Sequence, residues 1–189
     1  PWPTAAYDLK PDVVTLGKPL GGGIPAAAYG MSQEVADRAS AKITADSTDE
    51  SGVGGTLSGN ALSVAATRAT LEHVITTEAF ERMIPLANRL ANGIDEIINA
   101  KELPWHVVRL GARVEYGFGA TPPKNGGESE DIEDPELDKL LHLYALNRGI
   151  LLTPFHNMML ISPDITAKDV DLHTNVFRAC VGELTTPSS

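Results

Sequence analysis

The chain has 189 residues, 42% of them hydrophobic and 21% charged, so it is long enough to bury a core and has the composition of a globular protein. Its formal net charge of -10, without any run of Lys and Arg, argues against nucleic acid and anionic membranes as partners. Cys180 is the single cysteine and the five histidines lack metal-binding spacing, which argues against a disulfide and a metal site. No apolar run reaches the roughly 20 residues of a membrane span, and we expect a cytoplasmic protein.

The first part of the chain predicts a pair of strands followed by helices. Two apolar segments, residues 12–16 and 26–30, flank a glycine-rich turn and favour strand, turn and strand. A short helical pattern begins at Ser32, and residues 40–55 are polar and interrupted by glycine, which predicts a loop. The small residues between 61 and 74 predict a buried helix.

A long helix is expected next, because apolar residues recur three and four positions apart from Phe80 to Ile98, behind a capping residue at Thr77. Beyond it, apolar residues alternate with polar residues over 113–118, which is typical of a half-buried strand. The polar residues 121–133 predict an exposed loop.

The last part of the chain predicts two more helices. Asp134 caps the first of them, Pro135 occupies its first position and Gly149 ends it. The final helix opens at Thr166 and runs toward the C-terminus. Short strands are expected at residues 150–152 and 158–161. Together these patterns indicate α/β folding, with residues 1–77 as the edge of a larger sheet domain and residues 78–189 as a smaller α+β domain.

Lys18 is the first residue whose position in the sequence suggests a catalytic role. It follows an apolar strand and precedes Pro19 and three glycines. Ligands of α/β sheets bind at the carboxyl ends of strands, where a partly desolvated lysine can offer a neutral amine to a carbonyl carbon. A phosphate loop of the Walker type is excluded, because there the glycines precede the lysine. A surface lysine before a turn is the simpler alternative.

A second candidate site is the segment from Gly54 to Asn60, with the sequence GGTLSGN, which opens a helix. Backbone N–H groups freed by glycine, the Thr56 hydroxyl and a helix N-terminus together suit an anion such as phosphate. Taken alone, Thr56 or Ser58 could equally be a plain helix cap.

The two segments in combination carry a family resemblance. The string PDVVTLGKPLGGGIPAAAYG, followed by GGTLSGNALSVAATRATLE, resembles the class III aminotransferases, which include glutamate-1-semialdehyde aminomutase and the ω-amino-acid and amine transaminases. The resemblance runs over nearly all of the chain. It implies a pyridoxal-phosphate-dependent transferase of fold type I, with residues 1–77 as the C-terminal part of the large cofactor-binding domain and residues 78–189 as the small C-terminal domain.

The resemblance also assigns roles to individual residues. Lys18 falls on the lysine that holds pyridoxal 5'-phosphate as a Schiff base. Thr56, with Gly55, falls on the segment that holds the cofactor phosphate across the interface of a homodimer. The family's aspartate that pairs with the pyridine nitrogen belongs to an upstream segment that this chain does not contain. Because the chain also begins at Pro1 rather than Met, we expect it to be part of a longer protein.

A narrower likeness bears on the reaction. The strings RLGARVEYGFG and LHLYALNRGILLTPFHNMMLISP are similar to β-amino-acid and aromatic amine transaminases, which implies transfer of an amino group from a β-amino acid or amine to a keto acid. Two alternatives remain open. One is an aminomutase of the glutamate-1-semialdehyde type, and the other is a catalytically inactive truncated chain that acts only as an interaction module.

Two arginines are candidates for binding a substrate carboxylate. Arg113 lies on the strand over 113–118, and Arg148 precedes the glycine that ends a helix, so either guanidinium could form a fork on a carboxylate. Arg113 could equally face solvent, and Arg148 could cap the helix. Many family members carry an arginine before a late Leu-Pro-Pro segment, whereas residues 158–163 here read MMLISP.

Overall fold

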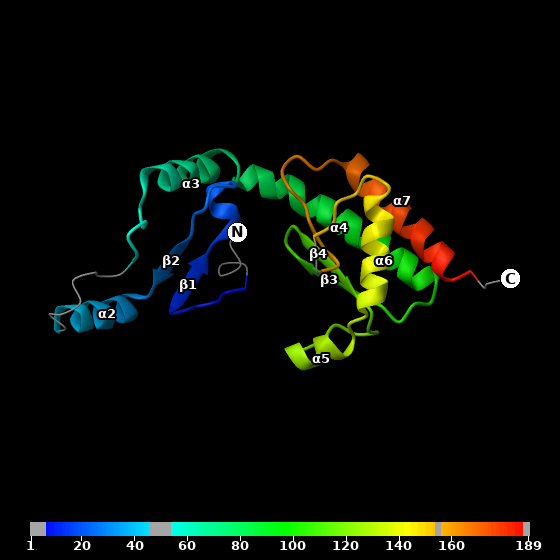
Figure 1. Cartoon of the computed structure of the whole chain (residues 1–189), viewed down its shortest axis with the longest axis horizontal. Helices are drawn as coiled ribbons and strands as arrows, with labels where there is room; N and C mark the ends of the chain where they lie inside the picture. Colours follow the sequence, from blue (N-terminus) through cyan, green and yellow to red (C-terminus); the bar gives the residue numbers. More distant parts are fainter. Residues whose placement is uncertain (1–6, 46–53, 154–155, 187–189) are drawn as a thin grey trace. The chain divides into compact units, whose positions relative to one another are not determined.

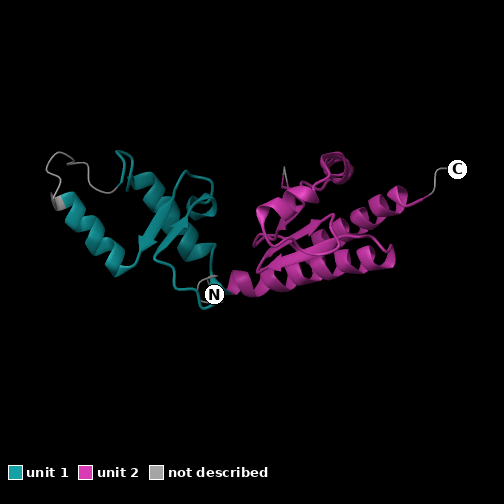
Figure 2. Cartoon of the chain, turned by 90° about the horizontal axis from the view of Figure 1, so that it is seen from below, with its two compact units in different colours: residues 1–77 teal, residues 78–189 magenta. Residues whose placement is uncertain are grey.

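The computed structural model describes residues 7–45, 54–153 and 156–186. It divides the chain into two compact units, residues 1–77 (unit 1) and residues 78–189 (unit 2), which are coloured separately in Figure 2. None of the helices in the described ranges is long and apolar enough to cross a membrane.

Unit 1 contains the predicted strand pair. Strand β1 (Val13–Leu16) pairs antiparallel with β2 (Ala28–Met31), and a 3-10 turn, η1 (Lys18–Gly21), begins two residues after β1 ends (Figure 1). Two helices follow, α2 (Gln33–Ala45) and α3 (Ala61–His73). The strand, turn and strand order expected from the sequence is therefore confirmed.

Two expectations for unit 1 are wrong. The loop predicted from residue 40 instead continues α2 as far as Ala45, because alanine and lysine favour the helix there; residues 46–53 lie outside the described residues. Helix α3 is not buried in this unit. Thr70 is the one buried residue among its thirteen, all of which are described, and Leu62 keeps 67% of its surface exposed.

In its described residues, unit 2 contains a sheet and four helices. Strands β3 (His106–Leu110), β4 (Arg113–Gly117) and β5 (Met158–Leu160) form an antiparallel sheet in that order. The helices are α4 (Thr77–Ala100), α5 (Gly126–Asp131), α6 (Pro135–Leu146) and α7 (Ala167–Leu184) (Figure 1). The periodicities that predicted α4, β4, α6 and α7 are confirmed.

The core of unit 2 lies between the sheet and its long helices. The apolar face of α4 meets β4, α6 and α7, and the most deeply buried large side chains are Leu90, Ile94, Ile97, Val114 and Val181. Removing each from water contributes roughly 1.5–3 kcal/mol. The predicted alternation of β4 is confirmed, because Val114 and Tyr116 are buried whereas Arg113 and Glu115 are partly exposed.

The helix ends in unit 2 follow the sequence signals. The Asp134 side chain accepts hydrogen bonds from the N–H groups of Glu136 and Leu137, Pro135 follows it, and Gly149 adopts a positive φ of 82° after α6. At α7, Thr166 and Asp169 form a capping box.

Three expectations for unit 2 are corrected. Residues 150–152 are not a strand, because the segment forms no ladder with the sheet. Strand β3 escaped sequence reasoning, since adjacent Val107 and Val108 do not alternate with polar residues. The segment predicted as a loop, 121–133, holds α5, which is capped by the Asn125 side chain at the N–H of Glu128.

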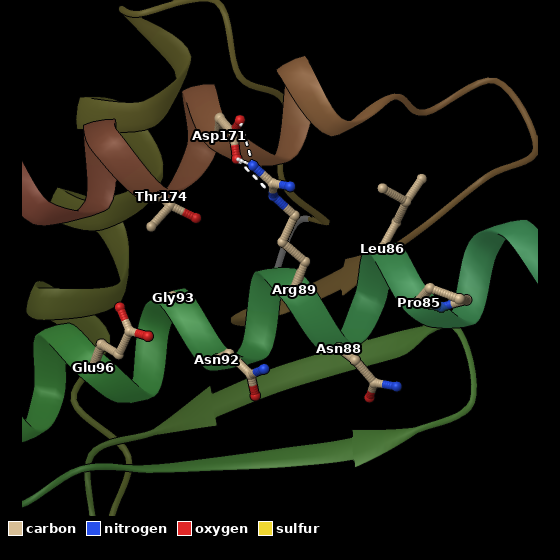
Figure 3. Close-up of a pocket in the computed structure, with 9 residues that line it drawn as sticks. All are labelled: Pro85, Leu86, Asn88, Arg89, Asn92, Gly93, Glu96, Asp171 and Thr174. Carbon is tan, nitrogen blue, oxygen red and sulfur yellow. Dashed lines mark hydrogen bonds and ion pairs between the residues drawn. The ribbon is translucent and has the colours of Figure 1, made fainter.

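Helices α4 and α7 approach closely at Gly93. Gly93 of α4 and Thr174 of α7 are labelled in Figure 3. A Cβ atom on Gly93 would lie 2.7 Å from Cγ2 of Thr174, whose hydroxyl donates to the Val170 carbonyl and cannot turn away without losing that bond. Gly182 of α7 has open space around its missing Cβ.

We therefore predict opposite effects for two glycine substitutions in unit 2. Gly93→Ala should lower the free energy of unfolding by about 1–3 kcal/mol through overpacking. Gly182→Ala should raise it by up to about 1 kcal/mol through helix propensity. Urea unfolding of the whole protein measures both changes. Adding Thr174→Ala should restore stability to the Gly93→Ala variant, and failure of this rescue would contradict the close approach.

Candidate functional site

Lys18 lies at the first position of η1, two residues beyond the end of β1. The turn is anchored by the buried Leu20, whose N–H donates to the Gly17 carbonyl at 2.9 Å. Lys18 lines a surface depression whose other lining residues are small or apolar, namely Gly23, Ile24, Pro25, Ala26 and Ala27. It pairs with no carboxylate of the described residues, which leaves its amine available. The expected desolvation is not found, because the side chain is exposed.

Glycines shape the chain after Lys18. Gly22 and Gly23 have φ angles of 58° and 104°, in the left-handed region that side chains rarely adopt. A Cβ on Gly22 would lie 2.8 Å from the Thr70 hydroxyl oxygen, so the turn packs directly on α3. The glycines that the sequence placed after Lys18 therefore allow both the turn and its contact with a helix.

The Thr56 segment forms a tight turn of its own. The Gly55 N–H donates to the Ser58 hydroxyl oxygen at 2.8 Å, and the Ser58 N–H donates to the Gly55 carbonyl at 2.9 Å. Thr56 is exposed and forms no hydrogen bond with any residue that the structure describes. The Gly55 N–H already donates to Ser58, so Gly55 holds the conformation of the turn and cannot itself donate to an anion. The donors that are not bonded to described residues are the hydroxyl and the N–H of Thr56. Such donors ahead of a helix fit a phosphate group.

Hydrogen bonds of α3 join these two turns. The Ser63 hydroxyl donates to the Pro25 carbonyl at 2.7 Å, on the rim of the Lys18 depression. The Asn60 side chain, at the end of the Thr56 turn, accepts from the Ser63 N–H and donates to the Ser63 hydroxyl, both at 3.0 Å. The structure thus brings the Lys18 and Thr56 segments into one bonded network. Sequence reasoning missed Asn60 and Ser63, although Asn before a helical run is a capping signal.

Arg113 carries its charge partner on its own strand. Its guanidinium contacts one carboxylate oxygen of Glu115, and the other oxygen lies 3.7 Å from Nδ1 of His156. The Arg113 side chain keeps 43% of its surface exposed, so it remains accessible to a second carboxylate.

Arg148 has contacts typical of a helix C-terminus. It donates to the Tyr144 carbonyl at 3.2 Å, and its guanidinium carbon lies 3.4 Å from the centre of the Tyr144 ring. No contact joins Arg148 to Arg113 among the described residues. The structure therefore does not bring the two arginines together as one carboxylate fork, and the substrate roles of both stay predictions.

A larger hollow in unit 2 is chemically less suited to catalysis. It lies between α4 and α7, and Figure 3 shows Arg89 reaching Asp171 across it, with two hydrogen bonds of 2.9 and 2.8 Å. This pair neutralises itself, so neither charge is left unpaired in the hollow. In the part of the chain that the structure describes, no three His, Cys, Asp or Glu residues are grouped to hold a metal ion.

The chain is similar to known proteins over most of its length. The family described as "Aminotransferase class-III" matches residues 1–180. A glutamate-1-semialdehyde 2,1-aminomutase of Thermus thermophilus is 37% identical over 152 residues, which cover 80% of this chain and 34% of that protein. The chain thus spans about a third of the length of this relative.

Two solved structures are also similar. A glutamate-1-semialdehyde aminomutase from Pseudomonas aeruginosa PAO1, solved as a lysine-to-alanine variant in complex with PMP, is 46% identical, with a TM-score of 0.91 over 96% of this chain and 41% of that one. A β-phenylalanine aminotransferase from Variovorax paradoxus is 24% identical, with a TM-score of 0.74 over 95% of this chain and 40% of that one. The second likeness extends to the fold alone.

Proposed function

The chain belongs to the class III aminotransferase family, and on that premise we propose that the whole protein is a pyridoxal-phosphate-dependent aminomutase acting on glutamate 1-semialdehyde. The observation that carries this proposal is the 46% identity across 96% of the chain to the Pseudomonas aeruginosa aminomutase. It reverses the order suggested by the sequence strings, which favoured a β-amino-acid transaminase. The chain spans 41% of that relative, so the activity is proposed for the whole protein.

Lys18 is the residue to which we assign the cofactor and the proton transfers. Pyridoxal phosphate, when bound, supplies a carbonyl for the amine and a ring that stabilises negative charge on a substrate carbon. Lys18 Nζ would hold the cofactor through that carbonyl carbon, and the same amine would act as general base and acid, moving a proton between the substrate carbon and the cofactor carbon. The side chain is exposed, pairs with no carboxylate of the described residues and lies beside small residues, which fits this role because a flat ring can approach it closely.

Thr56 is assigned to the cofactor phosphate. Its hydroxyl and backbone N–H are free of bonds to described residues, and the turn held by Gly55 and Ser58 presents them outward. In the family this segment serves the site of the partner subunit, so the proposal includes a homodimer, with cytoplasmic location as expected from the sequence. Residues 1–77 then form the C-terminal part of the large cofactor-binding domain and residues 78–189 the small domain.

The substrate carboxylate is assigned to arginine. Glutamate 1-semialdehyde carries one carboxylate, at the end of the molecule away from its amino and aldehyde groups, and a guanidinium matches it with two parallel hydrogen bonds. Arg113 is the better placed of the two candidates, because a partly exposed guanidinium shared with Glu115 can accept a second carboxylate. Arg148 would first have to leave the Tyr144 carbonyl and ring.

The reaction separates the aminomutase from a transaminase. We expect the whole protein, given its cofactor and glutamate 1-semialdehyde alone, to form the isomer with exchanged amino and oxo groups, because no second substrate is needed. Lys18→Ala should lower kcat by at least about 100-fold, since general acid–base catalysis contributes roughly 10²–10⁴-fold. Lys42→Ala, an exposed lysine on α2, is the matched control and should be unchanged. Turnover of β-phenylalanine with pyruvate, and none of the semialdehyde, would replace the aminomutase by the transaminase.

Loss of the Thr56 hydroxyl should affect cofactor affinity more than turnover. Thr56→Ala removes one hydrogen bond to phosphate, worth about 1.4 kcal/mol, and should raise the Kd for pyridoxal phosphate roughly tenfold. At saturating cofactor, kcat should stay near that of the unmodified protein, because the hydroxyl touches no reacting atom. Thr56→Ser keeps the hydroxyl and should bind normally. A collapse of kcat with unchanged affinity would contradict the phosphate role.

A further inference from the structure

His142 faces backbone carbonyl groups with both of its ring nitrogens. On α6, Nδ1 lies 2.8 Å from the Asp138 carbonyl oxygen, whereas Nε2 lies 2.9 Å from that of Thr153 and 3.1 Å from that of His156. A carbonyl oxygen can only accept, so each nitrogen must carry a hydrogen. A neutral imidazole has one N–H and would turn a lone pair toward a carbonyl on one side. The imidazolium has two and satisfies both sides.

We propose that His142 is held as an imidazolium and acts as a positioning residue, binding the backbone at Thr153 and His156 to α6 and thereby setting the surroundings of the ion pair between Arg113 and Glu115. The effect of His142 on substrate binding rests on the proposed role of Arg113 in binding the substrate carboxylate. The charge and contacts of His142 do not depend on that function.

The contacts run continuously from His142 to Arg113. The His156 carbonyl accepts from His142, and the His156 ring lies 3.7 Å from the Glu115 carboxylate that also contacts Arg113. Holding His156 therefore keeps a second partner beside Glu115. If His156 moved away, Glu115 would have Arg113 as its remaining partner in this group, and Arg113 would be less available to a substrate.

Asn157, which follows His156, forms two further hydrogen bonds that hold the same segment. The Asn157 side-chain NH2 group donates to the Asp138 carboxylate at 2.6 Å, and the Asn157 backbone carbonyl accepts from the Tyr116 N–H of β4 at 3.3 Å. Asn157 is buried, so these bonds are shielded from water. The backbone at His156 and Asn157 is thus held between α6 and the sheet, and His142 supplies the hydrogen bond that depends on charge.

The Asp138 carboxylate and three backbone carbonyl groups favour the protonated form of His142. Asp138 lies on its own helix, His156 on the tied segment, and Glu115 with Arg113 on β4 beyond it. Burial lowers the pKa of His142, but the three carbonyl groups and the Asp138 charge raise it more, so that the pKa lies above its ordinary value of 6.5. Because folding raises this pKa, the stabilisation is present at low pH and is lost as pH rises through the folded pKa.

Histidine NMR on the whole protein measures the charge directly. With imidazole carbons labelled and the resonance assigned by its absence in His142→Gln, we expect the His142 resonance to titrate above pH 6.5. Titration at or below 6.5 would overturn the imidazolium. No turnover is needed, so this result stands or fails separately from the proposed aminomutase activity.

Thermal unfolding against pH provides a second measurement of the same charge. The Tm difference between the unmodified protein and His142→Gln should be largest near pH 6 and should shrink as pH rises through the folded pKa. His73→Gln is the matched control, because His73 is an exposed histidine on α3 with one carboxylate 3.9 Å away. A Tm difference that does not change with pH would contradict a charge-dependent tie.

The positioning role has its own readout. In His142→Gln the His156 resonance should shift, because its ring leaves Glu115, and KM for the carboxylate substrate should rise while kcat changes less. His73→Gln should leave both unchanged. If the protein turns over a transaminase substrate instead, the same KM comparison applies to that carboxylate. If the His156 resonance does not shift, or if KM is unchanged, His142 does not position Arg113 and the proposed positioning role is wrong.

Discussion

The hydrogen bond from Ser63 to the Pro25 carbonyl is the contact that holds the two candidate cofactor segments, which the proposal assigns to the sites of the two subunits of a dimer, to one helix. It attaches the chain after Lys18 to α3, and Asn60 attaches the Thr56 turn to the same serine. The Lys18 turn and the turn proposed to bind phosphate, which lie far apart in sequence, are therefore both fixed to α3. The close approach of Gly22 to Thr70 locks the other side of the same turn.

Unit 2 contains the two arginines that are candidates for binding the substrate carboxylate. Its core is apolar and closely packed, and its polar contacts are concentrated where α6, β4 and the backbone at His156 meet. The two arginines considered for substrate binding differ physically: Arg148 stacks on Tyr144 as a helix cap, whereas Arg113 shares Glu115 with a histidine. Because the Glu115 carboxylate has His156 as a second partner, the Arg113 guanidinium remains available to a ligand. In the proposal, the hydrogen bonds of His142 hold His156 beside Glu115.

Many turns, helix ends and strands could be predicted because they depend on residues close together in the sequence. The glycines after Lys18, the capping residues Asp134 and Thr166, and the alternation in β4 each act over a few residues. The family resemblance added the cofactor and the role of Lys18, which local patterns alone left open.

The remaining features depend on contacts that no local pattern records. Helix α3 has the composition of a buried helix, but burial depends on what covers it, and most of its surface is exposed in unit 1. The link from Ser63 to Pro25 and the three carbonyl groups around His142 join residues distant in sequence. The choice between aminomutase and transaminase also lay beyond the motifs, because both reactions use the same lysine.

The most direct test of the central claim is to locate the cofactor on the whole protein. Borohydride reduction of the pyridoxal-phosphate-loaded protein, followed by peptide mass analysis, should place the pyridoxyl group on Lys18 because its exposed amine adjoins the depression and is unpaired among the described residues. A pyridoxyl group on Lys10 or Lys42 instead, with Lys18 unmodified, would contradict the account.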